Sequence, residues 1–277
     1  MRNVFRNEKH QALFEKDGYV ILDVLEANEI ELLLDIFSRE ESNLVKMPFA
    51  TSNMAGNSEL KLGISNTMES IFSKKIAEIF DEYKWFFGSF IYKYPSVNAT
   101  KGEVAMHQDA SLVDEDKFHG INIFCSLGVA NKESGALQVV PGSHRLNPYP
   151  RGFGQPFPYD HLQDQLFSRL KRIDLNPGQA IIYTTKLFHY SKPNLSTAPR
   201  IIAAGIVGPK ESTLRYYHVE RDSAKKLEIF EVDAQYYLTS PYFQKPDASQ
   251  YALKEEIPVL WEPLDENKIE EFLPIDA

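Results

Sequence analysis

Two side chains that could bind a metal, His107 and Asp109, are separated by a single residue in the segment Met-His-Gln-Asp. In an extended strand, residues two apart point to the same side, so this imidazole and this carboxylate would aim at one point. A third candidate, His189, follows the apolar run 179–183. Two imidazoles and one carboxylate leave three positions of an octahedron open, as in non-haem iron(II) oxygenases, for a chelating 2-oxo acid and O₂. Taken alone, a pair of two residues can arise by coincidence, and His107 could equally be a hydrogen-bonded surface residue.

Arg200 is the next informative residue, because it begins an apolar segment at 200–207. A turn through Pro193 and Asn194 would bring this segment back beside the one that carries His189, so that Arg200 enters a pocket next to the metal. A planar guanidinium binds a carboxylate through two hydrogen bonds, which suits the distal end of 2-oxoglutarate. The alternative is a surface ion pair of little energetic value. With His107 and Asp109 upstream, we favour the pocket.

The elements that must position these residues are mainly β-strands. In segment 121–127, apolar residues alternate with Asn122, Phe124 and Ser126, the period of a strand with two unlike faces. Strands are also predicted at 18–22, 85–94, 136–140, 179–184, 187–190, 200–207 and 213–218, and helices at 7–16, 26–46, 68–84, 159–170 and 266–272. Many short strands with Gly/Pro turns predict a mainly β fold with flanking helices, a β-sandwich or jelly roll.

No linker divides the chain, so we predict one domain over 1–277, with a β core at about 85–218, a helical N-terminal part and a variable C-terminal tail. The net charge of −9 makes nucleic acid an unexpected partner. No apolar run reaches the roughly 18 residues of a membrane span, and the N-terminus does not resemble a signal peptide. The single cysteine, Cys125, excludes an intramolecular disulfide and fits a reducing compartment, so the predicted location is cytoplasmic. The oligomeric state is not predicted.

Four motifs together resemble the phytanoyl-CoA dioxygenase family of iron/2-oxoglutarate oxygenases, which includes ectoine hydroxylases. They are Phe14-x-x-x-Gly18-Tyr-Val-Ile-Leu, His107-Gln-Asp109, Gly135-Ala-Leu-Gln-Val-Val-Pro-Gly-Ser-His144 and His189-x-Ser191-x-x-Asn194-x-Ser196-x-x-x-Arg200. Their order and spacing are specific as a set, and they span roughly residues 14 to 207. No motif is recognised in 220–277.

The resemblance implies a double-stranded β-helix, a jelly-roll relative that agrees with the strand pattern. It implies His107, Asp109 and His189 as ligands of Fe(II), and Arg200 as the anchor of 2-oxoglutarate with Ser191 assisting. Lys93 and Tyr92 lie on a strand that contributes to 2-oxoglutarate binding in relatives, so either could donate to its carboxylates. The alternative for Lys93 is an edge lysine whose stem packs while its amine reaches water. Related halogenases lack the carboxylate, so Asp109 disfavours halogenation.

The predicted function is therefore an Fe(II)- and 2-oxoglutarate-dependent dioxygenase that uses O₂ to hydroxylate an unactivated C–H bond of a small molecule, releasing succinate and CO₂. The same chemistry could instead give desaturation, cyclisation or epimerisation in natural-product biosynthesis. A non-catalytic jelly-roll binding module is a third possibility. Loops at 98–101, 110–118 and 148–158 and the tail would determine the substrate.

Other polar residues are assigned structural or solvent roles. His144, in a Pro-Gly-Ser-His turn, is expected to be structural. His119 could face the pocket, but a solvated loop position is favoured. The acidic run Asp114-Glu115-Asp116 is predicted to be a solvated loop, because it lacks the spacing of a calcium-binding loop.

Overall fold

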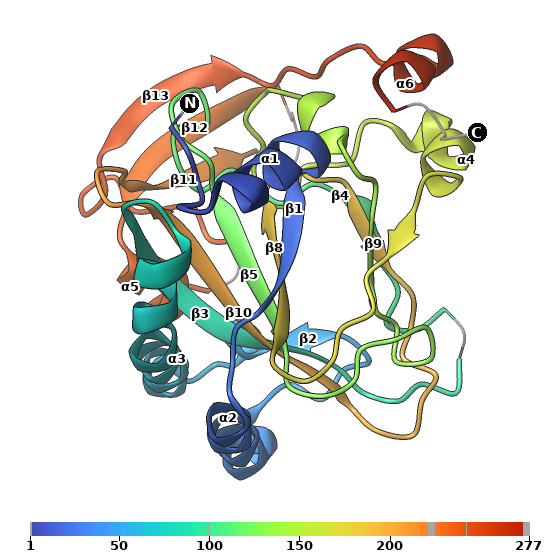
Figure 1. Ribbon diagram of the computed structural model, residues 1–277. Coiled ribbons are helices and arrows are strands. Elements are labelled where there is room, and N and C mark those ends of the chain that lie inside the picture. Colours follow the sequence, from blue (N-terminus) through green and yellow to red (C-terminus); the bar gives the residue numbers. More distant parts are fainter. Residues whose placement is uncertain (1, 99, 221–224, 242, 274–277) are drawn as a thin grey trace.

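A computed structural model describes residues 2–98, 100–220, 225–241 and 243–273 of the chain (Figure 1). The predicted domain over 1–277 also includes positions 1, 99, 221–224, 242 and 274–277, which lie outside the described residues. The α-helices are α1 (Glu8–Asp17), α2 (Ala27–Glu40), α3 (Ser58–Ile79), α4 (Gln163–Phe167), α5 (Ala234–Thr239) and α6 (Glu266–Phe272). The strands are β1 (Tyr19–Asp23), β2 (Ala50–Thr51), β3 (Tyr83–Lys93), β4 (Val104–His107), β5 (Ile121–Ser126), β6 (Leu137–Val139), β7 (Lys171–Arg172), β8 (Gln179–Thr184), β9 (His189–Ser191), β10 (Arg200–Pro209), β11 (Leu214–Val219), β12 (Lys226–Val232) and β13 (Leu253–Pro258).

The largest sheet has six strands in the order β1-β8-β5-β10-β3-β2, and every neighbouring pair is antiparallel. The alternation predicted for 121–127 matches the faces of the sheet on which the side chains of β5 lie. Ile121, Ile123 and Cys125 belong to the cluster under the helices, whereas Phe124 belongs to a second cluster on the opposite face. The prediction of a strand with two unlike faces is confirmed.

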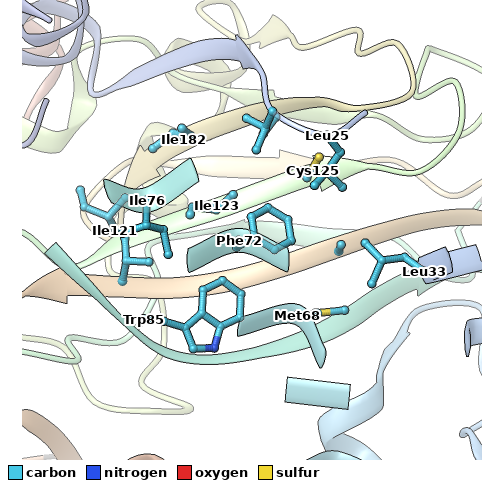
Figure 2. Packing of buried hydrophobic residues seen from close by; sticks show 14 of the residues in the cluster. Leu25, Leu33, Met68, Phe72, Ile76, Trp85, Ile121, Ile123, Cys125 and Ile182 are labelled. Atoms are coloured by element: carbon cyan, nitrogen blue, oxygen red, sulfur yellow. The ribbon is translucent and has the colours of Figure 1, made fainter. Parts of the chain in front are cut away.

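Helices α2 and α3 cover the outer face of this sheet (Figure 1). Leu33 from α2 and Met68, Phe72 and Ile76 from α3 are buried against the strands, as Figure 2 shows. The ring of Phe72 stacks on that of Trp85, with centroids 5.5 Å apart. Burial of each such side chain contributes roughly 1.5–3 kcal/mol, so this layer holds the sheet in place.

Helix α3 differs from its prediction at both ends, because it begins at Ser58 rather than at 68 and ends at Ile79 rather than at 84. The side chain of Asn57 accepts hydrogen bonds from the backbone N–H groups of Glu59 and Leu60, which makes it the N-cap. At the other end, Tyr83 and Lys84 already pair with β10 as part of β3. The cap and the strand pairing therefore set boundaries that apolar spacing alone does not show.

A smaller sheet in the order β4-β9-β6-β7 packs against the inner face of the large one. Leu137 and Val139 of β6 lie in one buried cluster with Phe124, Ile181 and Ile202 from the large sheet. Two antiparallel sheets packed in this way, with helices outside, form the double-stranded β-helix or jelly roll. The predicted fold class is confirmed.

A third sheet, β11-β12-β13, begins at the end of the predicted β core and continues beyond it, and α5 packs near this sheet. The sequence predicts only the first of these strands, at 213–218. Strand β13 (Leu253–Pro258) is exposed along most of its length, so it has no apolar alternation to reveal it. The C-terminal helix is confirmed as predicted, and its Ile269 is buried in a cluster with Leu166 of α4.

Among the described helices, none has the length and apolar character needed to cross a membrane.

Candidate metal centre

Strand pairing brings the three predicted metal ligands together. His107 ends β4 and His189 begins β9, and the two residues are partners in the antiparallel register. Their rings lie side by side, with centroids 4.1 Å apart, and each Nε2 is 3.7 Å from Asp109 Oδ1. One ligand atom from each of the three residues lies within 4.8 Å of the others. Asp109 follows β4 directly, where its backbone N–H donates to the carbonyl of Thr185 at 3.0 Å.

Each imidazole is oriented by a backbone carbonyl two residues before it. His107 Nδ1 is 2.8 Å from the Ala105 oxygen, and His189 Nδ1 is 2.9 Å from the Leu187 oxygen. An Nδ1–H that donates to a carbonyl leaves the lone pair of Nε2 available for a metal. Burial, and after it the neighbouring His189, lower the pKa of His107, which keeps its ring neutral as a ligand must be.

The carboxylate of Asp109 is oriented by Asn122 on β5. Asn122 Nδ2 donates to Asp109 Oδ2 at 2.8 Å, which occupies the oxygen that faces away from the histidines. The other oxygen, Oδ1, is the one placed between the two Nε2 atoms. The site therefore presents two nitrogen lone pairs and one carboxylate oxygen, a donor set that fits ferrous iron.

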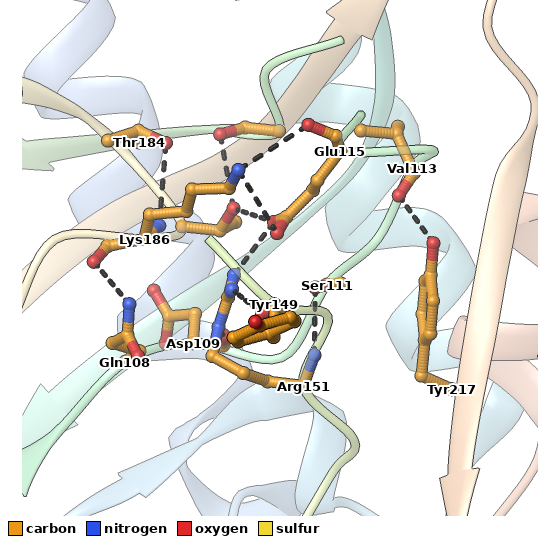
Figure 3. Close-up of polar contacts among 12 residues, drawn as sticks. Gln108, Asp109, Ser111, Val113, Glu115, Tyr149, Arg151, Thr184, Lys186 and Tyr217 are labelled. Atoms are coloured by element: carbon orange, nitrogen blue, oxygen red, sulfur yellow. Dashed lines mark hydrogen bonds and ion pairs between the residues drawn. The ribbon is translucent and has the colours of Figure 1, made fainter. Parts of the chain in front are cut away.

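A buried ionic network lies behind Asp109 (Figure 3). Arg151 Nε donates to the backbone oxygen of Asp109 at 2.9 Å, and its Nη2 donates to Glu115 Oε1 at 2.8 Å. Thr185 Oγ1 also donates to Glu115 Oε1, at 2.7 Å, and Lys186 Nζ lies 4.0 Å from Glu115 Oε2. Burial alone would raise the pKa of Glu115, but the charges of Arg151 and Lys186 outweigh it and lower that pKa. The network fixes the backbone of the predicted ligand.

This network corrects the prediction of a solvated acidic loop at 114–116, since Glu115 is only 2% exposed. The sequence gives no signal for it, because Arg151 and Lys186 are distant along the chain and neither belongs to a motif with Glu115. A buried carboxylate needs such partners, because an unpaired buried charge is costly.

Arg200, Lys93 and Ser191 lie together at one end of the inner face of the large sheet. Arg200 and Lys93 are cross-strand partners on β10 and β3. Lys93 Nζ donates to Ser191 Oγ at 2.7 Å, to Ser191 O at 3.1 Å and to Lys192 O at 2.6 Å. Arg200 Nη1 donates to the Gly135 carbonyl, whereas its buried Nε has no hydrogen-bond partner among the described residues. The structure thus assembles three of the four predicted 2-oxoglutarate residues.

Tyr92 is the predicted residue that the structure does not bring to this group. It precedes Lys93 on β3, so its side chain points to the opposite face. There it is fully buried under α2, with its ring 5.3 Å from that of Phe37, and its hydroxyl donates to the Val45 carbonyl at 2.9 Å. We therefore assign Tyr92 to the core rather than to a cofactor site.

The two remaining histidines of interest, His119 and His144, pack around Phe14 of α1. His119 is not a solvated loop residue as favoured above, because its ring meets Phe14 edge-on at 5.4 Å and burial lowers its pKa to about 4. His144 lies against Gly18, whose φ of +82° and close neighbours leave no room for a Cβ.

A cleft lies beside Asp109 and Asn122, with a volume of about 950 Å³ that includes space open to solvent. Its floor is the inner face of β3 and β10, represented by Ile91, Ala204 and Ile206. Of the three loops predicted to determine the substrate, 110–118 supplies Leu112 and 148–158 supplies Phe153, whereas no described residue of 98–101 lines the cleft. A molecule held there would lie next to Asp109, one of the predicted metal ligands.

Comparison with known protein families gives one match, to the family described as phytanoyl-CoA dioxygenase (PhyH), over residues 14–202. Among curated proteins, no relative matches the chain.

Several solved structures share the fold. The non-haem α-ketoglutarate-dependent carbocyclase SnoK of nogalamycin biosynthesis is 15% identical with a TM-score of 0.55, over 76% of this chain and 87% of that one. The epimerase SnoN of the same biosynthesis is 18% identical with a TM-score of 0.52, over 75% and 84%. EctD from S. alaskensis is 19% identical with a TM-score of 0.51, over 75% and 79%. At these identities the likeness is one of fold.

One SnoN structure contains Fe³⁺, α-ketoglutarate and nogalamycin RO, and the structure of EvdO2 from Micromonospora carbonacea var. aurantiaca contains 2-oxoglutarate. The chain has a His–Asp–His group that could hold such an ion. The predicted cofactors, iron and 2-oxoglutarate, agree with this group and with these neighbours; O₂ stays a prediction.

Proposed function

The chain belongs to the phytanoyl-CoA dioxygenase family, whose chemistry is that of iron/2-oxoglutarate oxygenases, and from this premise we propose that it hydroxylates an unactivated C–H bond of a small molecule. The observation that carries the proposal is the convergence of His107, Asp109 and His189, with one ligand atom of each within 4.8 Å of the others.

In this proposal His107 Nε2, Asp109 Oδ1 and His189 Nε2 hold the iron. When bound together with 2-oxoglutarate and O₂, the iron supplies the oxidising power for attack on a C–H bond, with succinate and CO₂ as co-products. The protein supplies orientation. The Ala105 and Leu187 carbonyls hold the rings, and partners of this kind typically affect metal affinity by about 10–100-fold.

Arg200 and Lys93 are the proposed binding residues for the distal carboxylate of 2-oxoglutarate, with Ser191 between them and the metal ligand His189 on β9. The Arg200 side chain is 4% exposed and that of Lys93 is fully buried, and neither forms an ion pair with a carboxylate among the described residues. A buried guanidinium is costly unless an anion joins it, and such an anion would also favour the protonated amine of Lys93. A dicarboxylate co-substrate would supply that anion, and the fork of Arg200 suits it.

Apolar side chains around Arg200 and His189 also support binding of 2-oxoglutarate here. The guanidinium of Arg200 lies 5.7 Å from the ring centroid of Phe124, and the ring of Tyr183 meets that of His189 edge-on at 5.4 Å. Such walls exclude water and strengthen the attraction between a guanidinium and a carboxylate. Burial lowers the pKa of Arg200 to about 10, so it still carries its charge at neutral pH.

A second outcome of the same chemistry is favoured by the structural neighbours, which include an epimerase and a carbocyclase. Product mass separates the outcomes. Hydroxylation adds one oxygen, desaturation or ring closure removes two hydrogens, and epimerisation leaves the mass unchanged.

The test of the proposal is the formation of succinate and CO₂ by the purified chain. We expect equal amounts of both from 2-oxoglutarate, only with Fe(II) and O₂ present, and none with Zn²⁺ in place of iron. A protein that binds Fe(II) and 2-oxoglutarate but forms no succinate with or without added small molecules would be a binding module instead. The cytoplasm is the compartment that we propose, since the only cysteine, Cys125, is a buried free thiol.

A further inference from the structure

The wall of the cleft beside Asp109 is aromatic, and most of it comes from chain beyond the residues 14–202 that match the family. The aromatic lining residues are Phe87, Phe153, Tyr216, Tyr236, Tyr237 and Phe243. Four of these six follow residue 202, on β11, on α5 and in the segment after α5. This part of the chain therefore shapes the space in front of the candidate metal centre.

The rings of the wall are held against one another. Phe153 stacks on Tyr216 with centroids 5.2 Å apart and planes 9° from parallel, and Phe87 stacks on Tyr237 at 4.8 Å and 18°. The Tyr237 hydroxyl donates to the Arg215 carbonyl at 2.6 Å, and the Tyr236 hydroxyl donates to the Gln244 carbonyl. Because these two hydroxyls are bonded to backbone, the two tyrosines offer the cleft apolar ring surface.

Charge is nearly absent from the cleft. Among the described lining residues, Asp109, a proposed metal ligand, is the only carboxylate, and none is a lysine, arginine or histidine. Arg151 and Arg172, two basic residues that a phosphate could otherwise use, are paired with Glu115 and Asp174. A coenzyme A thioester, with its several phosphate charges, would find no cation here.

One polar group in the lining has no partner. Asn53, just after β2, has its side-chain oxygen buried without a hydrogen bond among the described residues. This oxygen is closed off from solvent, so the cleft offers a ligand little of it. Thr51, Ser89 and Ser240 add a few further polar atoms to an otherwise apolar surface.

We propose that the cleft binds an uncharged, planar, ring-bearing small molecule that packs against this aromatic wall. Part of the cleft's volume of about 950 Å³ is open to solvent, so the aromatic wall rather than the volume defines the ligand. Offset or edge-to-face contact with the wall would hold the ring system, and its near edge would then face Asp109. This inference rests on the proposed function only in treating Asp109 as part of the reaction centre.

The experiment measures binding rather than turnover. The full chain, loaded with Fe(II) and 2-oxoglutarate under argon, is titrated calorimetrically with 2,7-dihydroxynaphthalene, with naphthalene and with octanoyl-coenzyme A. We expect saturable one-to-one binding of the diol and none of the thioester. Phe243→Ala should weaken diol binding about tenfold. Its matched control is Phe272→Ala on α6, where the side chain is similarly exposed (46% against 41%) but lies away from the cleft.

Naphthalene gives the sharper comparison, because a wall that offers ring surface should bind it as well as the diol, and Phe243→Ala should weaken both alike. Binding of the thioester in preference to the diol would overturn the inference, and so would a Phe243→Ala variant that binds the diol as the parent does. Binding of 2-oxoglutarate is measured in the same samples before the diol is added. If the diol binds but 2-oxoglutarate does not, the proposed function is wrong and the proposed ligand class stands. If 2-oxoglutarate binds but the diol does not, only the proposed ligand class is wrong.

Discussion

The candidate metal centre and the aromatic wall of the cleft face the same space but are built by opposite means. At the metal centre, single polar atoms are held by directional hydrogen bonds, such as Asn122 to Asp109 Oδ2 at 2.8 Å. In the wall, rings such as Phe153 and Tyr216 stack on one another, with centroids 5.2 Å apart. The first lies within residues 14–202 that match the family, and most of the second lies beyond them.

This difference separates chemistry from substrate choice. Directional bonds fix each donor atom closely, as a metal centre requires, and few replacements preserve them. A packed aromatic surface tolerates exchange of similar residues much better. We therefore expect substitutions in one region to leave the other nearly unchanged, and each prediction below tests that independence.

The largest effect is expected for Asp109→Ala, which removes one of the three proposed ligands. Loss of an outer partner already costs about 10–100-fold in metal affinity, so loss of a ligand should exceed a hundredfold. Calorimetric Fe(II) titration under argon measures it, and diol binding in the cleft should change only a few-fold. The control is Asp35→Ala on α2, where the carboxylate is 62% exposed and pairs only with Arg39. Equal iron affinity in Asp109→Ala and parent would remove Asp109 from the site.

Arg200→Gln should produce the next largest effect, on 2-oxoglutarate rather than on iron. A hydrogen bond to a charged group contributes about 1.5–3 kcal/mol, so affinity for the co-substrate should fall roughly 10–100-fold. Iron affinity should stay within a few-fold of the parent. The matched control is Arg172→Gln, which loses only an exposed pair with Asp174. If both variants bind 2-oxoglutarate alike, another residue anchors its distal carboxylate.

Asn122→Ala should weaken iron binding about tenfold, at the lower end of the range for partners of metal ligands. Without its amide, Asp109 Oδ2 is free to rotate, and Oδ1 loses its fixed position between the histidines. The melting temperature should change little, as in the control Asn43→Ala, whose amide bonds only Glu40. A drop in melting temperature with unchanged iron affinity would show a structural role instead.

The smallest effect is a pH dependence of 2-oxoglutarate binding through Lys93. Burial, and then the charge of Arg200, lower the pKa of Lys93 to about 6, so the free protein has lost most of this charge at pH 7. A bound carboxylate favours the ammonium form and raises that pKa, so binding takes up a proton. Affinity should then fall about fivefold from pH 6 to pH 7.

Calorimetry in buffers of different ionisation enthalpy measures this proton uptake directly. Diol binding should not follow the same curve, because none of the described residues that line the cleft is a lysine or histidine. Binding of 2-oxoglutarate without proton uptake would mean that Lys93 already carries its charge in the free protein.

The predictable part of the site is the part with a local pattern. His107 and Asp109 could be placed on one side because strand residues two apart share a face. Lys93 and Tyr92 could not be distinguished in the same way. They are adjacent on β3, both faces of this strand are buried, and only the packing of α2 over Tyr92 shows which face is the core.

Features assembled from distant segments could not be predicted from the sequence. Glu115 and Arg151 form a buried pair across a long stretch of chain, and neither spacing nor composition connects them. The aromatic wall joins Phe87 to Tyr237 in the same way. Strand β13 is almost fully exposed, so its sequence, Leu-Lys-Glu-Glu-Ile-Pro, resembles a charged loop, and its pairing with β12 appears only in the fold.

The most direct measurement of the central assignment is a crystal of the full chain grown without oxygen, with Fe(II) and 2-oxoglutarate, and recorded at the iron absorption edge. The account predicts one anomalous peak bonded to His107 Nε2, Asp109 Oδ1 and His189 Nε2, with the far carboxylate of the co-substrate on Arg200. An iron peak elsewhere in the molecule, or a co-substrate whose tail lies against other residues, would contradict it.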